Sequence, residues 1–238
     1  MLKYLFILLP IIGVSQDAIR VEYEVKQEFI NTSNDTKALS SDIFINSNNK
    51  RYFYELIVNK SVSNYKRIDR IDNTQTKGIS IGLTEAGSNI YKNFDTDNLY
   101  EQTKINPKIL VKDSIQTFPW ILSKEESKIL GYNVRKATYI NPTQIVEAWY
   151  APDLPFRDGP SRFNGLSGLI LKIKFKANFP LVDADTYITI SAIDIKPYTG
   201  KIELPKNTKV MEKEVSQEKA KKLYEKQKEL RSQGVEKD

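Results

Sequence analysis

The chain has 238 residues, a formal net charge of +6, and neither cysteine nor histidine. Its 40% apolar and 28% charged residues are the proportions of a folded globular domain, not of a disordered or collagen-like chain. Without His or Cys there can be no Ser-His-Asp triad, Cys-His pair, thiolate or imidazole zinc site, or disulfide. The chemistry that remains is that of carboxylates, lysine, tyrosine and hard metals with oxygen ligands.

Residues 1–15 have the features of a secretory signal peptide. Lys3 supplies a positive charge, an apolar stretch extends to Val14, and Ser15 completes a small-x-small cleavage site. The apolar stretch is too short to cross a bilayer core of about 30 Å as a helix. We therefore expect an exported protein that is periplasmic, outer-membrane-associated or extracellular, with no transmembrane span after signal removal. A buried apolar element is the alternative.

Apolar and polar residues alternate with a period of two along most of residues 16–205. Val21, Tyr23 and Val25 alternate with charged residues, which is typical of a half-buried strand. Short turn segments leave little room for crossover helices, so we predict one mainly β domain with a single antiparallel sheet, as a curved sheet, sandwich or half-barrel. Further strands are predicted at Asp42–Ser47, Arg51–Asn59, Gly78–Leu83, Asn89–Phe94, Asn98–Ile105, Ile109–Lys112, Lys128–Ile140, Gln144–Tyr150, Leu169–Phe175 and Thr186–Lys196.

Two local features refine this prediction. In the last predicted strand the apolar positions change parity between Ile190 and Ile193, which predicts a bulge or bend near Ala192. The pattern leaves a short central helix open around Ser123–Ile129.

The tail at residues 206–238 has a different composition. It is rich in charged residues and good helix formers and has no proline, which predicts a charged helix over about residues 210–232. Apolar residues such as Met211, Val215 and Leu223 form only a thin stripe along this helix. The tail is therefore either a solvated helix or a helix that binds a partner.

Two motifs that could carry chemistry are incomplete. The stretch from Gly165 to Gly168 is one residue short of the G-x-S-x-G nucleophile elbow, and no histidine can activate Ser167. The stretch that begins at Asn93 starts like a calcium loop, but Asn98 and Lys104 stand where Gly and a bidentate Glu are needed. The sequence therefore predicts no catalytic residue, no metal site and no cofactor.

The segment from Phe118 to Lys174 is the most unusual part of the chain, and it holds both tryptophans. It contains Ala148-Trp149-Tyr150, a proline-containing loop, and the motif Gly165-Leu166-Ser167-Gly168-Leu169-Ile170. This arrangement resembles the GLPGLI family of exported proteins from Bacteroidetes-type bacteria, with Ser167 where the family name has proline. The resemblance implies an exported, mainly antiparallel β protein, and it implies no activity because that family is one of unknown function.

The loop at residues 151–168 contains three prolines and three glycines, which fix its path without regular hydrogen bonding. It is either a structural lid, in which Phe156, Phe163 and Leu166 cap one end of the core, or part of a ligand groove. In the second case two arginines would anchor an anionic group or a sugar. The candidate ligand-binding residues are Trp149, Tyr150, Asp153, Arg157, Arg162 and Phe163.

These observations favour a non-catalytic binding or assembly module of the cell envelope. The expected partner is an outer-membrane or periplasmic protein, and the expected ligand is a lipid or glycan. Nucleic acid is not expected, because the positive charge is modest and is carried mainly by lysine. Two alternatives remain: a purely structural or assembly factor that acts through its C-terminal helix, and a carboxylate-based hydrolase that acts on envelope glycans.

Overall fold

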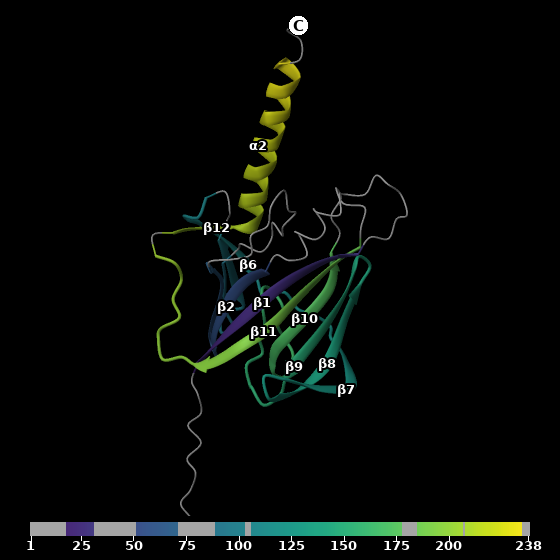
Figure 1. The fold of residues 1–238 in the computed structure, drawn as a ribbon. Helices are drawn as coiled ribbons and strands as arrows, with labels where there is room; N and C mark the ends of the chain where they lie inside the picture. Colours follow the sequence, from purple (N-terminus) through teal and green to yellow (C-terminus); the bar gives the residue numbers. More distant parts are fainter. Residues whose placement is uncertain are drawn as a thin grey trace, which may run out of the picture.

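The computed structural model describes residues 18–30, 51–70, 89–102, 106–177, 185–206 and 208–234. The predicted signal peptide and the predicted strands at Asp42–Ser47 and Gly78–Leu83 lie outside these residues. The described chain forms one curved sheet and one C-terminal helix (Figure 1), which confirms the predicted mainly β class.

Twelve strands make up the described sheet, and the helix α2 (Lys213–Gly234) follows the last of them. The strands are β1 (Ala18–Ile30), β2 (Arg51–Asn59), β3 (Val62–Ile68), β4 (Ile90–Asn93), β5 (Asn98–Gln102), β6 (Ile109–Ser114), β7 (Ile121–Ile129), β8 (Tyr132–Asn141), β9 (Gln144–Ala151), β10 (Leu169–Ala177), β11 (Asp185–Pro197) and β12 (Lys209–Glu212).

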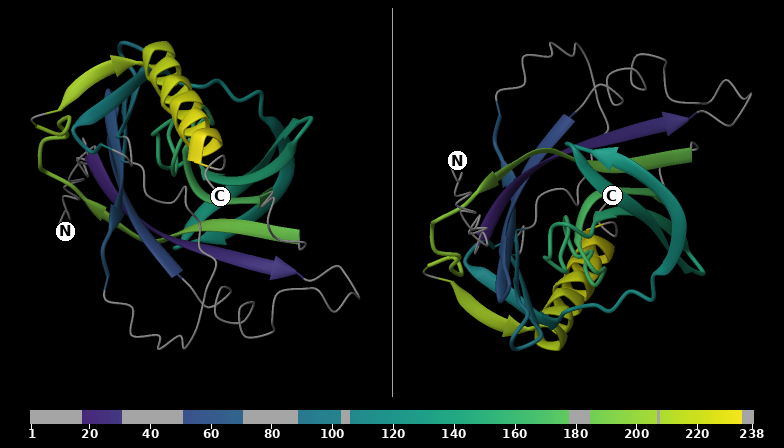
Figure 2. Two further views of the ribbon diagram at one scale, coloured as in Figure 1. Left: turned by 90° about the horizontal axis from the view of Figure 1, so that it is seen from above. Right: turned by 90° about the horizontal axis from the view of Figure 1, so that it is seen from below.

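The strand order is β12-β6-β5-β4-β3-β2-β1-β11-β10-β9-β8-β7. All neighbouring pairs are antiparallel except β12 and β6, which are parallel. The strong twist of so many strands curls the sheet into an open bowl. Figure 2 shows the strands curving around a central region, with α2 leading away from the edge at β12.

The hydrophobic core lies on the inner, concave face of this sheet. In β1 the buried residues Val21 and Tyr23 lie opposite Leu56 and Tyr54 of β2, because directly paired residues of an antiparallel sheet share a face. The loop at residues 151–168 covers this face. Its Leu154, Phe156 and Leu166 side chains are buried in the same cluster, so the core is enclosed between the sheet and the loop.

The predicted bulge near Ala192 is confirmed. The register of β1 against β11 pairs Glu22 with Asp194 and Tyr23 with Ala192, so Ile193 is an extra residue in β11. The helix was also predicted close to its observed bounds. No helix within the described residues has the length and apolar character needed to cross a membrane.

Other local predictions were wrong. The short helix left open around Ser123–Ile129 does not form, because these residues belong to strand β7, only the end of which was predicted as a strand. The predicted strand Lys128–Ile140 is divided by a tight turn in which Leu130 (φ 51°) and Gly131 (φ 85°) both adopt left-handed conformations, as a two-residue hairpin requires. Strands β3 and β12 and most of β7 were missed, and the parallel pairing of β12 departs from the expected antiparallel sheet.

Candidate functional site

The inner face of the sheet changes from apolar to charged between β1 and β6. Lys92 of β4, Leu99 of β5 and Asp113 of β6 form one cross-strand row, and Leu99 is fully buried in the core. Glu101 lies two residues beyond Leu99 on β5, so it faces the same side. Three strands therefore place a lysine and two carboxylates on the concave face.

The loop at residues 151–168 brings an arginine to these carboxylates. The Arg162 guanidinium forms an ion pair with Glu101, and its Nη1 lies 3.7 Å from Oδ2 of Asp113. At the start of α2, Nζ of Lys213 donates a hydrogen bond of 2.8 Å to the same Asp113 oxygen. We call Glu101, Asp113, Arg162 and Lys213 the inner charged cluster. Their side chains are between 19% and 44% exposed, so a ligand can reach them.

The cluster keeps Asp113 ionised. Burial by itself raises the pKa of the Asp113 carboxyl, but hydrogen bonds from Lys213 and the Ser114 backbone, together with the charges of Lys213 and Arg162, outweigh it. The net result is a pKa below the ordinary value of 3.8. At neutral pH this carboxylate can accept a proton or stabilise positive charge, and it carries no proton to donate.

A buried ion pair lies beside the cluster and ties the loop to the sheet. Nζ of Lys92 lies 2.5 Å from Oδ1 of Asp158, and the two side chains are 1% and 0% exposed. Lys92 also donates to the Phe163 carbonyl at 3.3 Å. Burial lowers the pKa of Lys92, and the Asp158 carboxylate opposes this shift. Because a buried charge without its partner is very unfavourable, the pair holds the loop firmly against β4.

Other contacts fix the loop on either side of Arg162. Trp120 donates from Nε1 to the Asn164 carbonyl at 2.8 Å, and Asn164 donates from its side chain to the Gln116 carbonyl at 3.1 Å. Ser161 adopts a left-handed conformation (φ 57°), which is uncommon for a residue other than glycine. Such strain persists only where the surrounding structure imposes it. The loop thus holds Arg162 in one position over β5 and β6.

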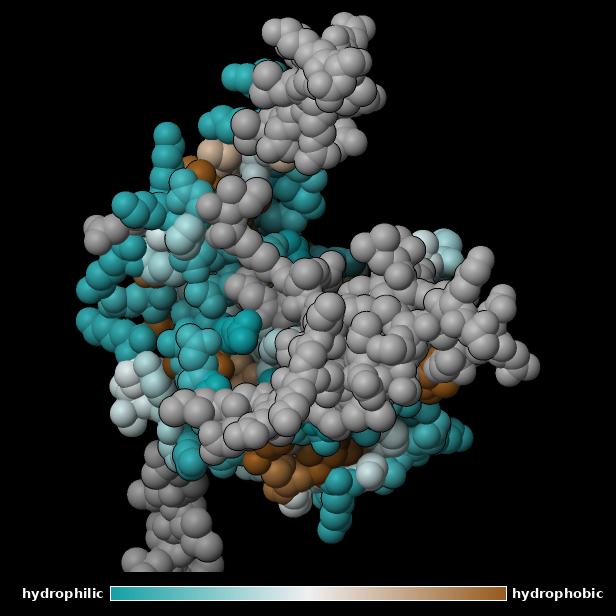
Figure 3. Space-filling view, turned by 45° about the horizontal axis from the view of Figure 1, so that its top comes forward, coloured by the Kyte–Doolittle hydropathy of each residue, from teal (hydrophilic) through white to brown (hydrophobic). Residues whose placement is uncertain are grey.

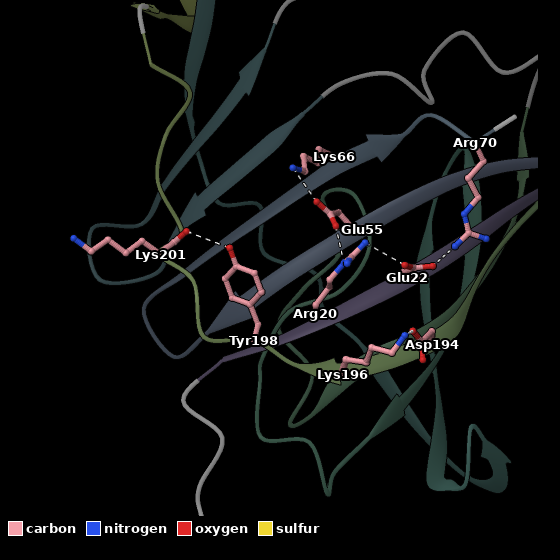
Figure 4. Close-up of polar contacts among 9 residues, drawn as sticks. All are labelled: Arg20, Glu22, Glu55, Lys66, Arg70, Asp194, Lys196, Tyr198 and Lys201. Carbon is pink, nitrogen blue, oxygen red and sulfur yellow. Dashed lines mark hydrogen bonds and ion pairs between the residues drawn. The ribbon is translucent and has the colours of Figure 1, made fainter.

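A second charged network lies on the outer face of the sheet (Figure 4). Glu22 of β1 and Glu55 of β2 are directly paired across the strands. Arg20 contacts both carboxylates, at 3.1 Å from Glu22 and 2.7 Å from Glu55. Lys66 contacts Glu55 at 2.8 Å, and Arg70 pairs with Glu22. We call these five residues the outer belt. Figure 4 also shows the neighbouring Lys196–Asp194 pair, at 2.6 Å.

The structure does not bring the six candidate ligand-binding residues into one groove. Tyr150 is buried in the core, whereas Trp149 faces the outer side of β9, where Nζ of Lys136 lies 5.9 Å from its ring centroid. Asp153 and Arg157 are exposed on the loop. Arg162 and Phe163 lie on the same inner face as Tyr150, but they are only partly buried.

Phe163 belongs to an aromatic cluster next to the inner charged cluster. Its ring centroid lies 5.3 Å from that of Phe118, 6.4 Å from that of Trp120 and 6.0 Å from that of Phe175. Trp120 and Phe163 are only half-buried. An aromatic surface therefore flanks the charged residues on the concave side.

The glycines of the sequence motif serve close packing. A Cβ at Gly168 would lie 2.2 Å from the Ala151 carbonyl oxygen, so no other residue fits there without backbone movement. Gly165 has φ 92°, which glycine adopts readily. Leu169 and Ile170 are fully buried, and Leu166 is 3% exposed, whereas Ser167 is exposed.

Sequence reasoning missed most of the charged inner residues. A usable signal was present, because Glu101 has the same strand parity as Leu99 and therefore had to face the core side. Nothing in the sequence indicated that Arg162 would lie against it. Within the described ranges, no group of three or more acidic side chains is arranged to hold a metal ion.

Residues 88–213, just over half of the chain, match the family described as N-glycanase peptide, N-terminal domain. The chain belongs to this family. The matched segment contains the whole inner charged cluster and the buried Lys92–Asp158 pair, whereas the residues of the outer belt all precede it. Among curated proteins, no sequence matches this chain.

Two solved crystal forms of PNGF-II have the same fold as this member of the N-glycanase domain family. The P21 form has a TM-score of 0.56 and 18% sequence identity, and the match covers 85% of this chain and 32% of that one. The C2 form has a TM-score of 0.51 and 19% identity, with 82% and 31% covered. The chain thus spans about a third of the length of these structures, and identity at this level shows the fold alone.

These findings correct three predictions. The resemblance to the GLPGLI family was wrong, because the family that matches is the N-glycanase domain. The Gly-Leu-Ser-Gly-Leu-Ile stretch is explained by the packing of Gly168 and the burial of Leu169 and Ile170. The non-catalytic binding or assembly module and the assignment as a non-enzyme were also wrong, because the matched family is one of glycan-processing enzymes. The glycan hydrolase agrees best with the family.

Proposed function

We propose that the chain acts in N-glycan processing as a hydrolase of the N-glycanase class, with the inner charged cluster as its reaction site. One observation carries this proposal: Arg162 joins two reachable carboxylates, Glu101 and Asp113, inside the segment that matches the N-glycanase family. Carboxylates are also, with lysine and tyrosine, among the acid-base groups that remain in a chain without histidine or cysteine.

The chemistry of the substrate class fits these residues. An N-linked glycan is attached through the side-chain amide of asparagine. Hydrolysis of an amide needs a base that activates water, positive charge near the developing oxyanion, and a proton for the leaving nitrogen. Asp113, which is held ionised, would take a proton from the attacking water, and Arg162 would stabilise the oxyanion. Glu101 would pass the proton that Asp113 takes from water to the leaving nitrogen, so that both carboxylates are ionised again when the amine departs.

The spacing of the two carboxylates supports this division of roles. Glu101 lies opposite Val111, two residues from Asp113, so the two acids are diagonal neighbours across β5 and β6. Diagonal neighbours are separated by roughly 7–8 Å at the backbone, which leaves room for a water molecule between their side chains. Export, predicted from residues 1–15, would bring the site to extracellular glycoproteins.

The test is incubation of the purified chain with a glycopeptide that carries one N-glycan, followed by mass spectrometry of both products. Amide hydrolysis converts the glycosylated asparagine into aspartate, whereas cleavage between sugars leaves a sugar on the asparagine. We expect Glu101→Gln and Asp113→Asn each to lower kcat/KM by about 100-fold or more. Glu22→Gln changes a carboxylate that is also held by arginine, but on the outer face, and should keep full activity.

Two outcomes would contradict the proposal in different ways. Full activity of both Glu101→Gln and Asp113→Asn would show that the reaction site lies outside the inner charged cluster. No glycan release by the unaltered chain, over a range of pH and glycopeptides, would remove the hydrolase function itself.

A further inference from the structure

A pocket of about 590 Å³ lies where the hairpin between β8 and β9 meets β10 and β11. Its walls include Ile140 and Ile145 at the base of the hairpin and Lys174 and Tyr187 on the next two strands. Lys174 faces the outer side of the sheet, because its neighbour Ile173 is fully buried on the inner side. The pocket and the inner charged cluster therefore lie on opposite faces and on different strands.

Part of the pocket wall is apolar and exposed. Ile140 and Ile145 are directly paired across the hairpin, and their side chains are 55% and 57% exposed. On the face drawn in Figure 3, most of the described surface is hydrophilic and the apolar residues gather in a few patches. Exposed aliphatic side chains next to a tyrosine ring suit the apolar faces of sugar rings. The volume also lies within the usual range for small-ligand sites, about 300–1,000 Å³.

The charged residues that line the pocket are Lys174, Lys176 and Glu147, so the lining carries one net positive charge. Glu147 is paired with Lys136 at 3.5 Å, and Lys136 also contacts Glu125 at 3.3 Å, whereas Lys176 is paired with Asp185 at 2.5 Å. For Lys174 the described residues supply no ion pair. Its Nζ lies 5.3 Å from the centroid of the Tyr187 ring, so the cation and the aromatic surface face the pocket together. A ligand that carries negative charge would complete this arrangement.

We propose that this pocket binds an acidic sugar residue and holds one branch of the glycan away from the reaction site. The choice of a sugar rests on the proposed function, whereas the requirement for negative charge rests on Lys174. A concave pocket of this size favours a discrete ligand over a flat lipid surface. The pocket would give the enzyme a preference for glycans with acidic ends.

The test is titration of the full chain with a sialylated biantennary oligosaccharide and with the same oligosaccharide after desialylation, followed by calorimetry or NMR. The sialylated form should bind at least about tenfold more tightly, since one added charge contact of about 1.4 kcal/mol has this effect. Lys174→Gln and Tyr187→Ala should each weaken its binding by a similar factor. Lys128→Gln removes the same charge from the exposed surface of β7, outside the pocket, and should change nothing.

The outcomes separate this proposal from the proposed function. Glu101→Gln should bind the sialylated oligosaccharide normally while losing hydrolysis. Equal affinity for the two oligosaccharides, or unchanged affinity in a folded Tyr187→Ala variant, would overturn the pocket assignment. Binding to anionic lipid vesicles that depends on Lys174, without sugar binding, would overturn it in favour of a membrane surface. Sugar binding without any glycan release would leave the pocket in place and remove the hydrolase.

Discussion

The inner charged cluster and the outer belt contain the same types of residue, but these residues come together from different distances along the chain. Each has two carboxylates on neighbouring strands and an arginine that contacts both. In the outer belt, Arg20 lies two residues from Glu22 on the same strand, whereas in the inner charged cluster Arg162 lies 61 residues from Glu101. The outer belt thus follows from strand register alone, while the inner one depends on a loop folded over the sheet.

This difference separates a stabilising network from a candidate reaction site. The carboxylates of the outer belt, Glu22 and Glu55, are 15% and 10% exposed, and cations from their own or nearby strands surround them. Those of the inner charged cluster, Glu101 and Asp113, are 28% and 19% exposed and lie beside an aromatic surface. Reachable charges that distant segments bring together are typical of functional sites.

The largest expected effect on stability concerns the buried pair behind the inner charged cluster. Asp158→Ala leaves Lys92 as a buried, unpaired cation and should lower the free energy of unfolding by about 3–5 kcal/mol. Glu22→Ala, in the outer belt, should cost at most about 1 kcal/mol, since partly exposed pairs contribute little. Urea denaturation measures both. Equal losses of unfolding free energy in the two variants would show that the buried pair and the outer belt contribute equally to stability.

The next comparison concerns two glycines. Gly168→Ala would press a methyl group against the Ala151 backbone and should cost about 1–3 kcal/mol or more. Gly131→Ala, in the turn between β7 and β8, meets no atom within 4 Å and should cost about 1 kcal/mol through its left-handed conformation alone. Urea midpoints of the two variants test this order. A smaller effect at Gly168 would mean that the loop can shift away from β9.

The loss of stability at acid pH gives a further comparison between the inner and outer faces of the sheet. Because the pKa of folded Asp113 lies below its ordinary value, its contribution to stability is present above about pH 4 and is lost as pH falls through the lower folded pKa. Asp113→Asn should therefore flatten the fall in melting temperature between about pH 5 and pH 2.

Asp194→Asn is the matched change on the outer face. The hydrogen bond from Lys196 is the main cause that lowers the pKa of Asp194, so this variant should flatten the same acid profile. It should keep glycan release, whereas Asp113→Asn should lose it. Equal activity in the two variants would contradict the functional contrast between the faces.

The smallest expected effect distinguishes two buried tyrosines of the inner face. Among the described residues the Tyr54 hydroxyl has no hydrogen-bond partner, whereas Tyr23 donates to the Ile170 carbonyl at 2.7 Å. At neutral pH Tyr54→Phe should leave stability unchanged or raise it by up to about 1 kcal/mol, and Tyr23→Phe should lower it by about that amount. Chemical denaturation of the two variants gives the sign.

The stability of the protein at alkaline pH gives a second test of Tyr54. Burial raises the pKa of Tyr54 above its ordinary value of 10.0, so its contribution to stability is present below pH 10 and is lost above it. The stability of Tyr54→Phe should therefore fall less with rising alkaline pH than that of the unaltered chain, as followed by circular dichroism. An identical alkaline profile would show that the Tyr54 hydroxyl stays solvated.

Several elements could be predicted because their signal is local. The bounds of β2 were predicted correctly, and the change of parity near Ala192 revealed the bulge in β11. Strand β7 was missed because almost all of its residues are exposed, so it lacks the alternation that marks a half-buried strand. Trp149 and Tyr150 are adjacent in sequence, and on a strand that adjacency places them on opposite faces.

The sequence by itself determined the β class, the C-terminal helix and the restriction of acid-base chemistry to carboxylates, lysine and tyrosine. These depend on residue periodicity and composition, which need no knowledge of distant neighbours. Only the tertiary structure decided that Arg162 meets Glu101 and Asp113, and that Lys92 is buried with Asp158. Strand order and the path of the loop bring these residues together, and both depend on packing across the whole curved sheet.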